Sequence, residues 1–315
     1  MIWRLRMLSL LLVTAISAAP ASAKGTPGDH NGSVNVGGFF RSYVVHIPPA
    51  YHTGVPLPVV FVFHGAGGSG RQILHRTGWD KKADASGFLV VAPDAALLNQ
   101  SIDPSDTNRA VWQETPENAS PKVGLSGDLT ERSTVDDIQF IGSLLDDLPR
   151  RYSVDTKRIY ATGFSNGAGF TWRLASLFST RFAACAPVCG LFGGMPSRPP
   201  RILPILFIAG LDDDVFPFRG GYIDQYGEKI GRPPVLGTVA AWAAAAGLPP
   251  GFDVLQQRTY PVTGDGITIL DYGKKLGSQK TTVYVVASMK HEWPKFKQFQ
   301  ATEVIWAFFQ QHSLP

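Results

Sequence analysis

Residues 163–167 read Gly-Phe-Ser-Asn-Gly, a G-x-S-x-G pattern whose flanks constrain the fold more than any other stretch of the chain. Residues 158–162 before it are β-branched and aromatic, as in a short strand. Residues 166–178 after it place large apolar side chains among small ones without a proline, as in a helix. Strand, tight turn and helix are the setting in which this serine stands at the tip of a strained turn. The pattern therefore predicts an α/β fold with Ser165 as a nucleophile.

The N-terminus has the pattern of an export signal. Arg4 and Arg6 precede an apolar run at residues 7–16, and residues 21–23 read Ala-Ser-Ala, as at a cleavage site. The apolar run is too short to span a bilayer. We therefore expect residues 1–23 to be a signal peptide and the mature protein to be secreted or periplasmic, with no membrane association after cleavage.

Residues 24–37 are rich in Gly, Asn and Ser and are expected to form a loose leader, and residues 38–315 a single catalytic domain. Apolar runs and helical patterns alternate along that domain, which predicts a mostly parallel, doubly wound sheet flanked by helices. Strands are expected at residues 39–47, 58–63, 88–91, 158–162, 182–188, 204–209 and 281–286, helices at residues 134–148, 166–178, 238–246 and 299–309, and a hairpin within residues 254–275.

Composition narrows the function classes. Lys and Arg number 29 and Asp and Glu 25, and removing the two signal-peptide arginines leaves 27 against 25, a net charge of +2. That balance, without a basic cluster, argues against a nucleic-acid partner. The hydrophobic share of 44% and the charged share of 17% are those of a globular protein.

The two cysteines, Cys185 and Cys189, could be free or could form a disulfide. On a straight strand, residues four apart lie about 13 Å from each other, which is too far for a disulfide. A sharp turn at Pro187 would allow one. Two cysteines without a nearby histidine do not make a zinc site, so we expect no metal.

A serine hydroxyl needs a base, and that base needs a group that holds its tautomer. His291 is the one histidine that follows both Ser165 and a predicted strand without lying in the C-terminal tail. Three aspartates follow the predicted strand at residues 204–209, and Asp213 is preferred over Asp212 and Asp214, which remain open.

The oxyanion of an acyl-transfer reaction needs backbone N–H donors. One is expected from Asn166, directly after the nucleophile. The other is expected from Ala66, in the His-Gly-Ala-Gly-Gly loop that follows the predicted strand at residues 58–63. His64 opens that loop and is expected to fix it rather than to act as the base.

These motifs together resemble the secreted poly(3-hydroxybutyrate) depolymerase-like esterases, which include feruloyl and acetylxylan esterases. The resemblance covers nearly the whole mature chain in order. The matching pieces are Arg-Ser-Tyr-Val-Val-His-Ile-Pro at 41–48, His-Gly-Ala-Gly-Gly at 64–68, Ala-Asp-Ala-Ser-Gly-Phe at 83–88, Val-Asp-Asp at 135–137, Gly-Phe-Ser-Asn-Gly-Ala at 163–168 and His-Glu-Trp-Pro at 291–294.

The resemblance implies an α/β-hydrolase fold, with Ser165 as nucleophile and His291 as base. Family members usually read Gly-Thr-x-Asp-x-x-Val-Pro around the acid, which aligns with Asp213 within Gly-Leu-Asp-Asp-Asp-Val-Phe-Pro at residues 210–217. Leucine and phenylalanine replace the usual threonine and valine, and Met-Lys replaces the glycines that commonly precede the histidine. These departures leave the substrate open.

The substrate pocket is expected to include Trp112, Phe164 and Trp293, with core packing as the alternative for each aromatic. The implied activity is hydrolysis of carboxylic esters through an acyl-enzyme without a cofactor. The implied substrates are polyhydroxyalkanoate oligomers or hydroxycinnamoyl or acetyl esters. The first alternative is hydrolysis of an anionic polyamide such as poly(aspartic acid), for which Lys290 beside His291 would be suited. The second alternative is a non-catalytic binding protein. The oligomeric state is left open.

Overall fold

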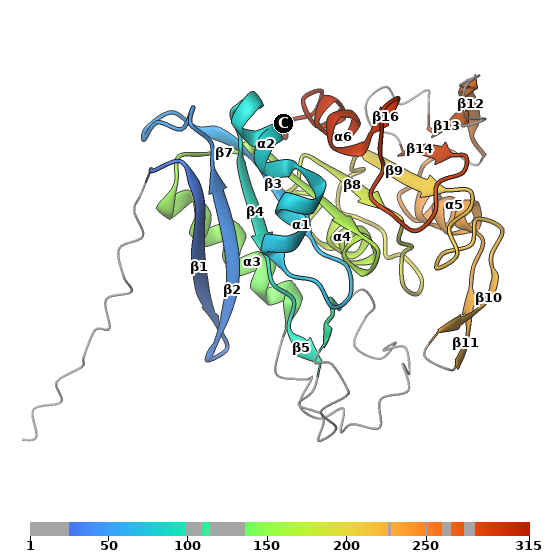
Figure 1. Ribbon diagram of the computed structural model, residues 1–315, viewed down its shortest axis with the longest axis horizontal. Coiled ribbons are helices and arrows are strands. Elements are labelled where there is room, and N and C mark those ends of the chain that lie inside the picture. The colour runs from blue at the N-terminus through green and yellow to red at the C-terminus, as the bar shows by residue number, and fades with distance from the viewer. Residues whose placement is uncertain are drawn as a thin grey trace, which may run out of the picture.

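A computed structural model describes residues 25–98, 109–113, 136–225, 228–249, 251–259, 266–273 and 281–315. The predicted signal peptide lies outside these residues. The main sheet has the spatial order β1-β2-β4-β3-β7-β8-β9-β14-β13-β12 (Figure 1). Its strands are β1 Gly28–Val36, β2 Phe39–Ile47, β3 Leu57–Phe63, β4 Leu89–Pro93, β7 Val154–Phe164, β8 Ala184–Val188, β9 Ile205–Gly210, β12 Asp253–Thr259, β13 Gly266–Tyr272 and β14 Thr281–Val286.

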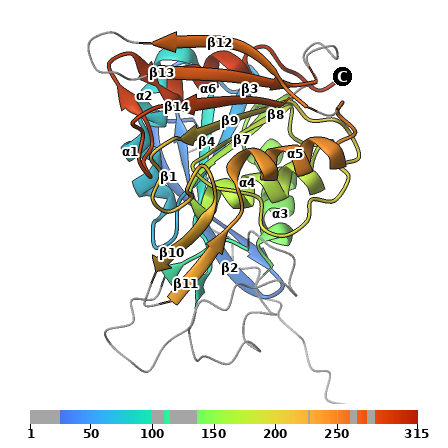
Figure 2. The same ribbon diagram turned by 90° about the vertical axis from the view of Figure 1, so that its right-hand side faces the viewer.

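The six central strands, from β4 to β14, are parallel, and an antiparallel pair continues the sheet on either side. The parallel strands carry continuous apolar runs because both of their faces are covered. Figure 2 shows β12 to β14 running across the view while β1 and β4 run down it, so the sheet is strongly twisted. The predicted sheet is therefore confirmed, and the bounds of β2 and β14 match the predicted strands.

Helices cover both faces of the sheet (Figure 1). One face packs against α1 (Gly70–Thr77), α2 (Trp79–Ser86) and α6 (Ala301–Phe309), and the other against α3 (Asp137–Arg151), α4 (Asn166–Leu177) and α5 (Val235–Ala245). A hydrophobic core lies on each face of the sheet, and alternate side chains of β3 pack into one or the other. Phe61 and Phe63 join the α3–α5 side, whereas Val60 and Val62 join the α1, α2 and α6 side.

Short strand pairs lie outside the main sheet: β5 (Leu97–Leu98) with β6 (Arg109–Ala110), β10 (Gly221–Gln225) with β11 (Glu228–Arg232), and β15 (Lys295–Phe296) with β16 (Phe299–Gln300). The pair β10–β11 projects from the body of the molecule in both ribbon views (Figures 1 and 2). Among the described residues, no helix combines the length and apolarity needed to cross a membrane.

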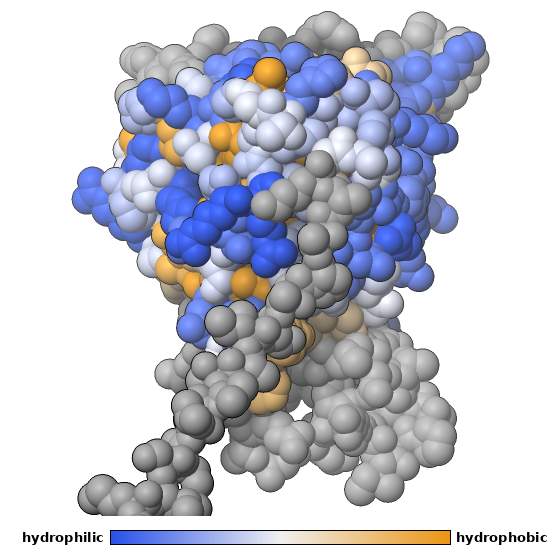
Figure 3. Space-filling view, turned by 90° about the vertical axis from the view of Figure 1, so that its left-hand side faces the viewer, coloured by the Kyte–Doolittle hydropathy of each residue, from blue (hydrophilic) through white to orange (hydrophobic). Residues whose placement is uncertain are grey.

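The expected loose leader at residues 24–37 is wrong where β1 forms. All nine residues of β1 pair with β2 in antiparallel register, from Gly28 opposite Ile47 to Val36 opposite Phe39. The strand escaped prediction because it is an edge strand with mostly polar residues. Such polarity protects a free edge from pairing with another chain. The face around this edge is mainly hydrophilic, with apolar side chains scattered over it (Figure 3).

Asp29 fastens β1 to the body of the molecule. Its carboxylate lies 2.7 Å from Nδ1 of His46 and 2.9 Å from Nε2 of His75, and it accepts a hydrogen bond of 2.8 Å from Arg71. Burial alone would raise the pKa of Asp29, but the hydrogen bond from His46 and the charges of His75, His46 and Arg71 outweigh it and lower that pKa. The N-terminal strand is thus tied to β2 and α1 by charge as well as by its ladder.

Because the central strands are parallel, their C-terminal ends meet at one edge of the sheet, which we call the carboxyl edge. Their N-terminal ends form the opposite amino edge. The loops after β3, β7, β8, β9 and β14 all leave from the carboxyl edge, where ligand sites of open α/β sheets are found. Every residue of the candidate site lies in one of these loops or next to it.

Candidate active site

Ser165 occupies a strained turn between β7 and α4. Its backbone has φ 57° and ψ −121°, a conformation that a non-glycine residue adopts only when its surroundings impose it. The flanking glycines make the turn possible. A Cβ on Gly163 would lie 2.3 Å from the carbonyl oxygen of Gly167, and one on Gly167 would lie 2.4 Å from the carbonyl oxygen of Phe63. The structure therefore has the strand, turn and helix that the sequence predicted, with Ser165 at the tip.

The loops after β9 and β14 bring two more predicted residues to Ser165. Nε2 of His291 lies 2.9 Å from Oγ of Ser165, and Nδ1 of His291 lies 3.0 Å from Oδ2 of Asp213. A carboxylate can only accept, so Nδ1 carries the proton and Nε2 is left to accept the hydroxyl proton of the serine. The arrangement can transfer a proton from Ser165 to His291 and hold the imidazolium that forms.

Asp213 is the aspartate of the three that faces inward. Its side chain is buried, whereas Asp212 and Asp214 are exposed. Oδ1 accepts hydrogen bonds from the backbone N–H groups of Val215 at 2.9 Å and Phe216 at 2.7 Å. Burial alone would raise the pKa of Asp213, but His291 and these N–H groups outweigh burial and lower it. Asp213 is therefore held ionised beside the histidine.

The loop after β3 places Ala66 exposed in a turn near the serine. A Cβ on Gly65 would lie 3.2 Å from Cβ of Ser165, so this loop passes close to the nucleophile. In the part of the chain that the structure describes, the N–H of Ala66 donates to no protein group, whereas that of Gly67 donates to the carbonyl of Ala110 at 2.8 Å. Asn166, at the first position of α4, is buried directly after Ser165.

His64 fixes the loop, as the sequence predicted. Nδ1 lies 2.8 Å from the carbonyl oxygen of Gly65, and Nε2 accepts the N–H of Ala95 at 3.0 Å. A nitrogen that faces a carbonyl must donate, which leaves Nε2 as the acceptor and the ring neutral. Burial lowers the pKa of His64, in keeping with a neutral ring.

Trp112 lies in the core, which corrects its assignment to the pocket. Its side chain is 1% exposed and packs between Phe63 and Phe170, at ring-centroid distances of 5.3 and 4.9 Å. Its indole N–H donates to the carbonyl of His64 at 3.0 Å, so the polar atom is satisfied inside. Its backbone N–H and carbonyl bind the side-chain amide of Asn166 at 2.7 and 3.1 Å, and Trp112 thereby positions the start of α4.

Trp293 is also buried, with 5% of its side chain exposed, and its indole N–H donates to Oγ1 of Thr302 at 3.1 Å. It therefore packs in the core on the α6 side, which corrects its assignment to the pocket. Phe164 does lie at the site, with its ring 4.9 Å from the ring of His291. Phe216 lies 5.7 Å from the same ring, a contact that the sequence reasoning missed because it took this position only as a departure from the family motif.

Both cysteines are free and buried, which answers the open question of a bridge. Cys189 lies beside the site. Its Sγ, a carboxylate oxygen of Asp213 and a ring nitrogen of His291 all lie within 4.8 Å of one another. Although Cys, Asp and His are metal-ligating types, both nitrogens of His291 and both oxygens of Asp213 already make the hydrogen bonds described above.

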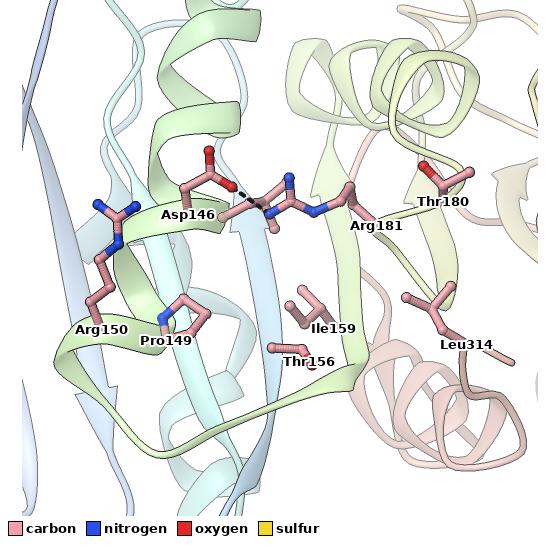
Figure 4. A pocket seen from close by; sticks show the side chains of 9 residues that line it. Asp146, Pro149, Arg150, Thr156, Ile159, Thr180, Arg181 and Leu314 are labelled. Atoms are coloured by element: carbon pink, nitrogen blue, oxygen red, sulfur yellow. Dashed lines mark hydrogen bonds and ion pairs between the residues drawn. The ribbon is translucent and has the colours of Figure 1, made fainter.

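A pocket lies at the amino edge, away from Ser165. This pocket of about 350 Å³ lies between the C-terminal part of α3, the start of β7 and the segment before β8 (Figure 4). Arg181 and Asp146 form an ion pair of 2.8 Å at its rim. None of the residues predicted for the site lines it.

Curated relatives are about a quarter identical to this chain over the residues that align. A bifunctional acetylxylan esterase/xylanase of Neocallimastix patriciarum is 26% identical over 60% of this chain and 24% of its own length. Feruloyl esterase D of Neurospora crassa is 27% identical over 59% of this chain and 61% of its own length. A probable feruloyl esterase C of Aspergillus niger is 27% identical over 68% of this chain and 70% of its own length. The first three curated relatives are thus matched over only 24%, 49% and 61% of their own lengths.

Solved structures show the same fold. An acetyl xylan esterase from Aspergillus awamori superposes with a TM-score of 0.58 at 14% identity, over 89% of this chain and 99% of its own. An S-formylglutathione hydrolase from Agrobacterium tumefaciens has a TM-score of 0.52 at 13% identity, over 91% and 95% of the two chains. The fold is the α/β-hydrolase fold that the resemblance implied.

The sequence resemblance to feruloyl and acetylxylan esterases is confirmed by the relatives that carry those names. A family model described as the dienelactone hydrolase family matches residues 43–229, more than half of the chain. The matched segment holds the Ser165 turn and Asp213 and ends before the His291 loop. The chain belongs to the dienelactone hydrolase family.

Proposed function

We propose that this protein hydrolyses carboxylic esters through an acyl-enzyme on Ser165. The hydrogen-bonded chain from Oγ of Ser165 through His291 to Asp213, with links of 2.9 and 3.0 Å, is the observation that supports the proposal most directly. A non-catalytic protein on this fold would need neither the strained φ of the serine nor the two hydrogen bonds that join Ser165, His291 and Asp213. The binding-protein alternative therefore has no observation in its favour.

In the proposed reaction, Oγ of Ser165 attacks the ester carbonyl while Nε2 of His291 takes the hydroxyl proton. The tetrahedral intermediate collapses, the C–O bond to the alcohol breaks, and His291 returns the proton to the leaving alcohol. A water molecule then attacks the acyl-enzyme with His291 again as base, which releases the acid and restores the serine. Asp213 keeps Nδ1 protonated and stabilises the imidazolium in both halves. These steps call for no cofactor.

The oxyanion of both intermediates is proposed to be held by the N–H groups of Ala66 and Asn166. Their places support this role, because one lies in the loop beside Ser165 and the other directly follows it at the start of α4. A helix N-terminus also carries partial positive charge. Each such donor typically stabilises the transition state by roughly 3 kcal/mol.

We propose that the substrate is an ester on plant polysaccharide, whose acyl group is either a small aromatic acid or acetate. Feruloyl and acetylxylan esterases stand among the relatives, and the rings of Phe164 and Phe216 flank His291, where they would contact an acyl group. A polyhydroxyalkanoate oligomer is the second ester candidate, from the motif resemblance. Hydrolysis of poly(aspartic acid) is supported only by the exposed Lys290 next to His291.

We also propose that the mature protein is secreted or periplasmic, from the signal-like pattern of residues 1–23. Cell fractionation with N-terminal sequencing of the exported form tests this. A new N-terminus at Lys24 would support export, and a cytoplasmic protein that keeps Met1 would contradict it.

The substrate is tested by acid release from methyl ferulate, an acetylated xylan, soluble 3-hydroxybutyrate oligomers and oligo-aspartate under identical conditions. Ser165→Ala is the control and should lose about a million-fold in kcat if the three residues act as proposed. Turnover of an ester that depends on Ser165 supports the proposal. Turnover of oligo-aspartate alone would move the protein to amide hydrolysis, and equal activity in Ser165→Ala would refute the mechanism.

A further inference from the structure

The short segment Val188–Gly190, at the end of β8, runs beneath the candidate site. The carbonyl of Val188 accepts the N–H of Ser165 at 3.0 Å, and the N–H of Cys189 donates to the carbonyl of Ile208 in β9 at 3.0 Å. A Cβ on Gly190 would lie 2.1 Å from the carbonyl oxygen of Ser165. One segment thus contacts the serine turn and is tied to the strand that leads to Asp213.

Cys189 faces the opposite core from the one that strand alternation assigns to it. Residues four apart on a strand share a face, yet Cys185 joins the core on the α3–α5 side and Cys189 the core on the α1, α2 and α6 side. The difference arises because Cys189 has φ 51°. Among the described residues that are not glycine, only Ser165, Cys189 and Ser288 have positive φ, and each follows the end of a central strand at the carboxyl edge.

The turn at Cys189 aims its thiol at the two loops that hold the acid and the base. Sγ donates to the carbonyl of Glu292, the residue after His291, at 3.4 Å. It also lies within 4.8 Å of both the Asp213 carboxylate and a His291 ring nitrogen. Burial, and then the charge of Asp213, raises the pKa of the Cys189 thiol. The side chain therefore remains a neutral donor and adds no second negative charge beside Asp213.

We propose that Cys189 is a positioning residue, whose thiol links the Asp213 and His291 loops and keeps water from the bond between them. The proposal rests on the proposed function, because it assigns Cys189 a part in that reaction without contact with the substrate. The strained backbone supports it, because a buried small residue that only filled space would not require a left-handed conformation. Cys185, fully buried near the start of β8, is the matched control.

The test compares Cys189→Ala, Cys189→Ser and Cys185→Ala in the full-length mature protein with an aryl acetate ester. Cys189→Ala should lower kcat on the order of 10- to 100-fold with little change in KM, because the loops lose alignment and not binding contacts. Cys189→Ser should recover kcat to within about threefold, since its hydroxyl can donate to the Glu292 carbonyl. Cys185→Ala should keep the wild-type kcat even where it lowers the melting temperature.

A second readout separates positioning from packing. The acidic limb of the kcat/KM profile should move to lower pH in Cys189→Ala, because a misaligned or hydrated Asp213 stabilises the imidazolium of His291 less. The profile should not move in Cys185→Ala. If Cys189→Ala matches Cys185→Ala in kcat and in pH profile, Cys189 only fills space and the proposal is wrong.

Two further experiments keep the test decisive. If Cys189→Ala does not fold, Cys189→Gly replaces it, because glycine adopts φ 51° without strain. If the wild-type protein hydrolyses no ester, the proposed function fails, while the positioning claim is still decided by the NMR signal of the His291 Nδ1 proton, which lies in the hydrogen bond to Asp213. A signal that is lost or broadened in the Cys189 variant but stays sharp in Cys185→Ala supports positioning, and equal signals in the two variants refute it.

Discussion

The two ends of β7 differ in their surroundings: one lines a pocket, and the other leads into a strained serine with hydrogen-bonded partners. At the amino edge, Thr156 and Ile159 line an open pocket of about 350 Å³ with the exposed Arg181–Asp146 pair at its rim (Figure 4). At the carboxyl edge, the same strand ends in Ser165 with φ 57° and a chain of two hydrogen bonds to buried partners. The pocket has volume but no converging groups. Strain and convergence, and not concavity, distinguish the candidate site.

Substitutions at the carboxyl edge should reduce activity far more than substitutions at the amino edge, and the largest loss is expected from Asp213→Asn. The amide would favour the wrong tautomer of His291, and kcat should fall roughly ten-thousandfold, as is typical of this change in Ser-His-Asp sites. Asp212→Asn and Asp214→Asn are the matched controls, because both side chains are exposed. Steady-state kinetics on one ester check all three. A loss in Asp214→Asn equal to that in Asp213→Asn would contradict the assignment.

A smaller effect is expected from Gly190→Ala, whose new Cβ would lie 2.1 Å from the carbonyl oxygen of Ser165. The serine turn must shift, so kcat/KM should fall about a hundredfold. The free energy of unfolding should also fall by about 1–3 kcal/mol. Gly142→Ala in α3 is the control, since its Cβ would meet Phe178 at an ordinary 3.6 Å and should stabilise the helix by roughly 0.5–1 kcal/mol. Equal behaviour of the two variants in denaturant melts and assays would show that the serine turn has room.

A pH dependence of stability is the next expected difference. The pKa of Asp213 is lowered in the folded state, so its ionised form stabilises the fold above the unfolded pKa of about 4. That contribution is lost as pH falls through the lower folded value. The stability gap between wild type and Asp213→Asn should therefore be largest above pH 4 and shrink below it, measured by urea melts from pH 3 to 7. A gap that is constant with pH would mean that the carboxylate is not held ionised.

The smallest effect is expected from Arg181→Ala at the amino edge. Both side chains of its ion pair with Asp146 are exposed, and such pairs contribute at most about 1 kcal/mol to the free energy of unfolding. The melting temperature should therefore change little, and kcat/KM should remain within about twofold of wild type, because no part of the reaction depends on this edge. A tenfold loss of activity would show that the amino-edge pocket takes part in function.

Most of the fold could be predicted because the central strands are apolar runs buried on both faces and the Gly-Phe-Ser-Asn-Gly turn has its own steric pattern. β1 could not, because its polar sequence reflects an edge position that only pairing with β2 reveals. Trp112 contacts the motif residue His64 in space, but nothing in the sequence says on which side of the sheet its ring packs. The position of the Cys189 side chain beside the site could not be predicted, because strand alternation does not indicate a left-handed residue.

Among the three adjacent aspartates, the motif alignment favoured Asp213, and burial in the structure separates it from its neighbours. Ser165 and His291 could be proposed from order along the chain, because each follows a predicted strand and the ends of parallel strands meet at one edge. The distances between them depend on loop conformations that the sequence pattern does not encode.

The most direct test of the site is covalent labelling of Ser165 by a fluorophosphonate, followed by intact-mass measurement and peptide mapping. An activated serine displaces fluoride, and a phosphonate ester forms on Oγ. Wild-type protein should gain one adduct mapped to Ser165, Asp213→Asn should react far more slowly, and Ser165→Ala should gain none. An adduct on another residue, or equal labelling of Ser165→Ala, would contradict the assignment of Ser165 as the nucleophile.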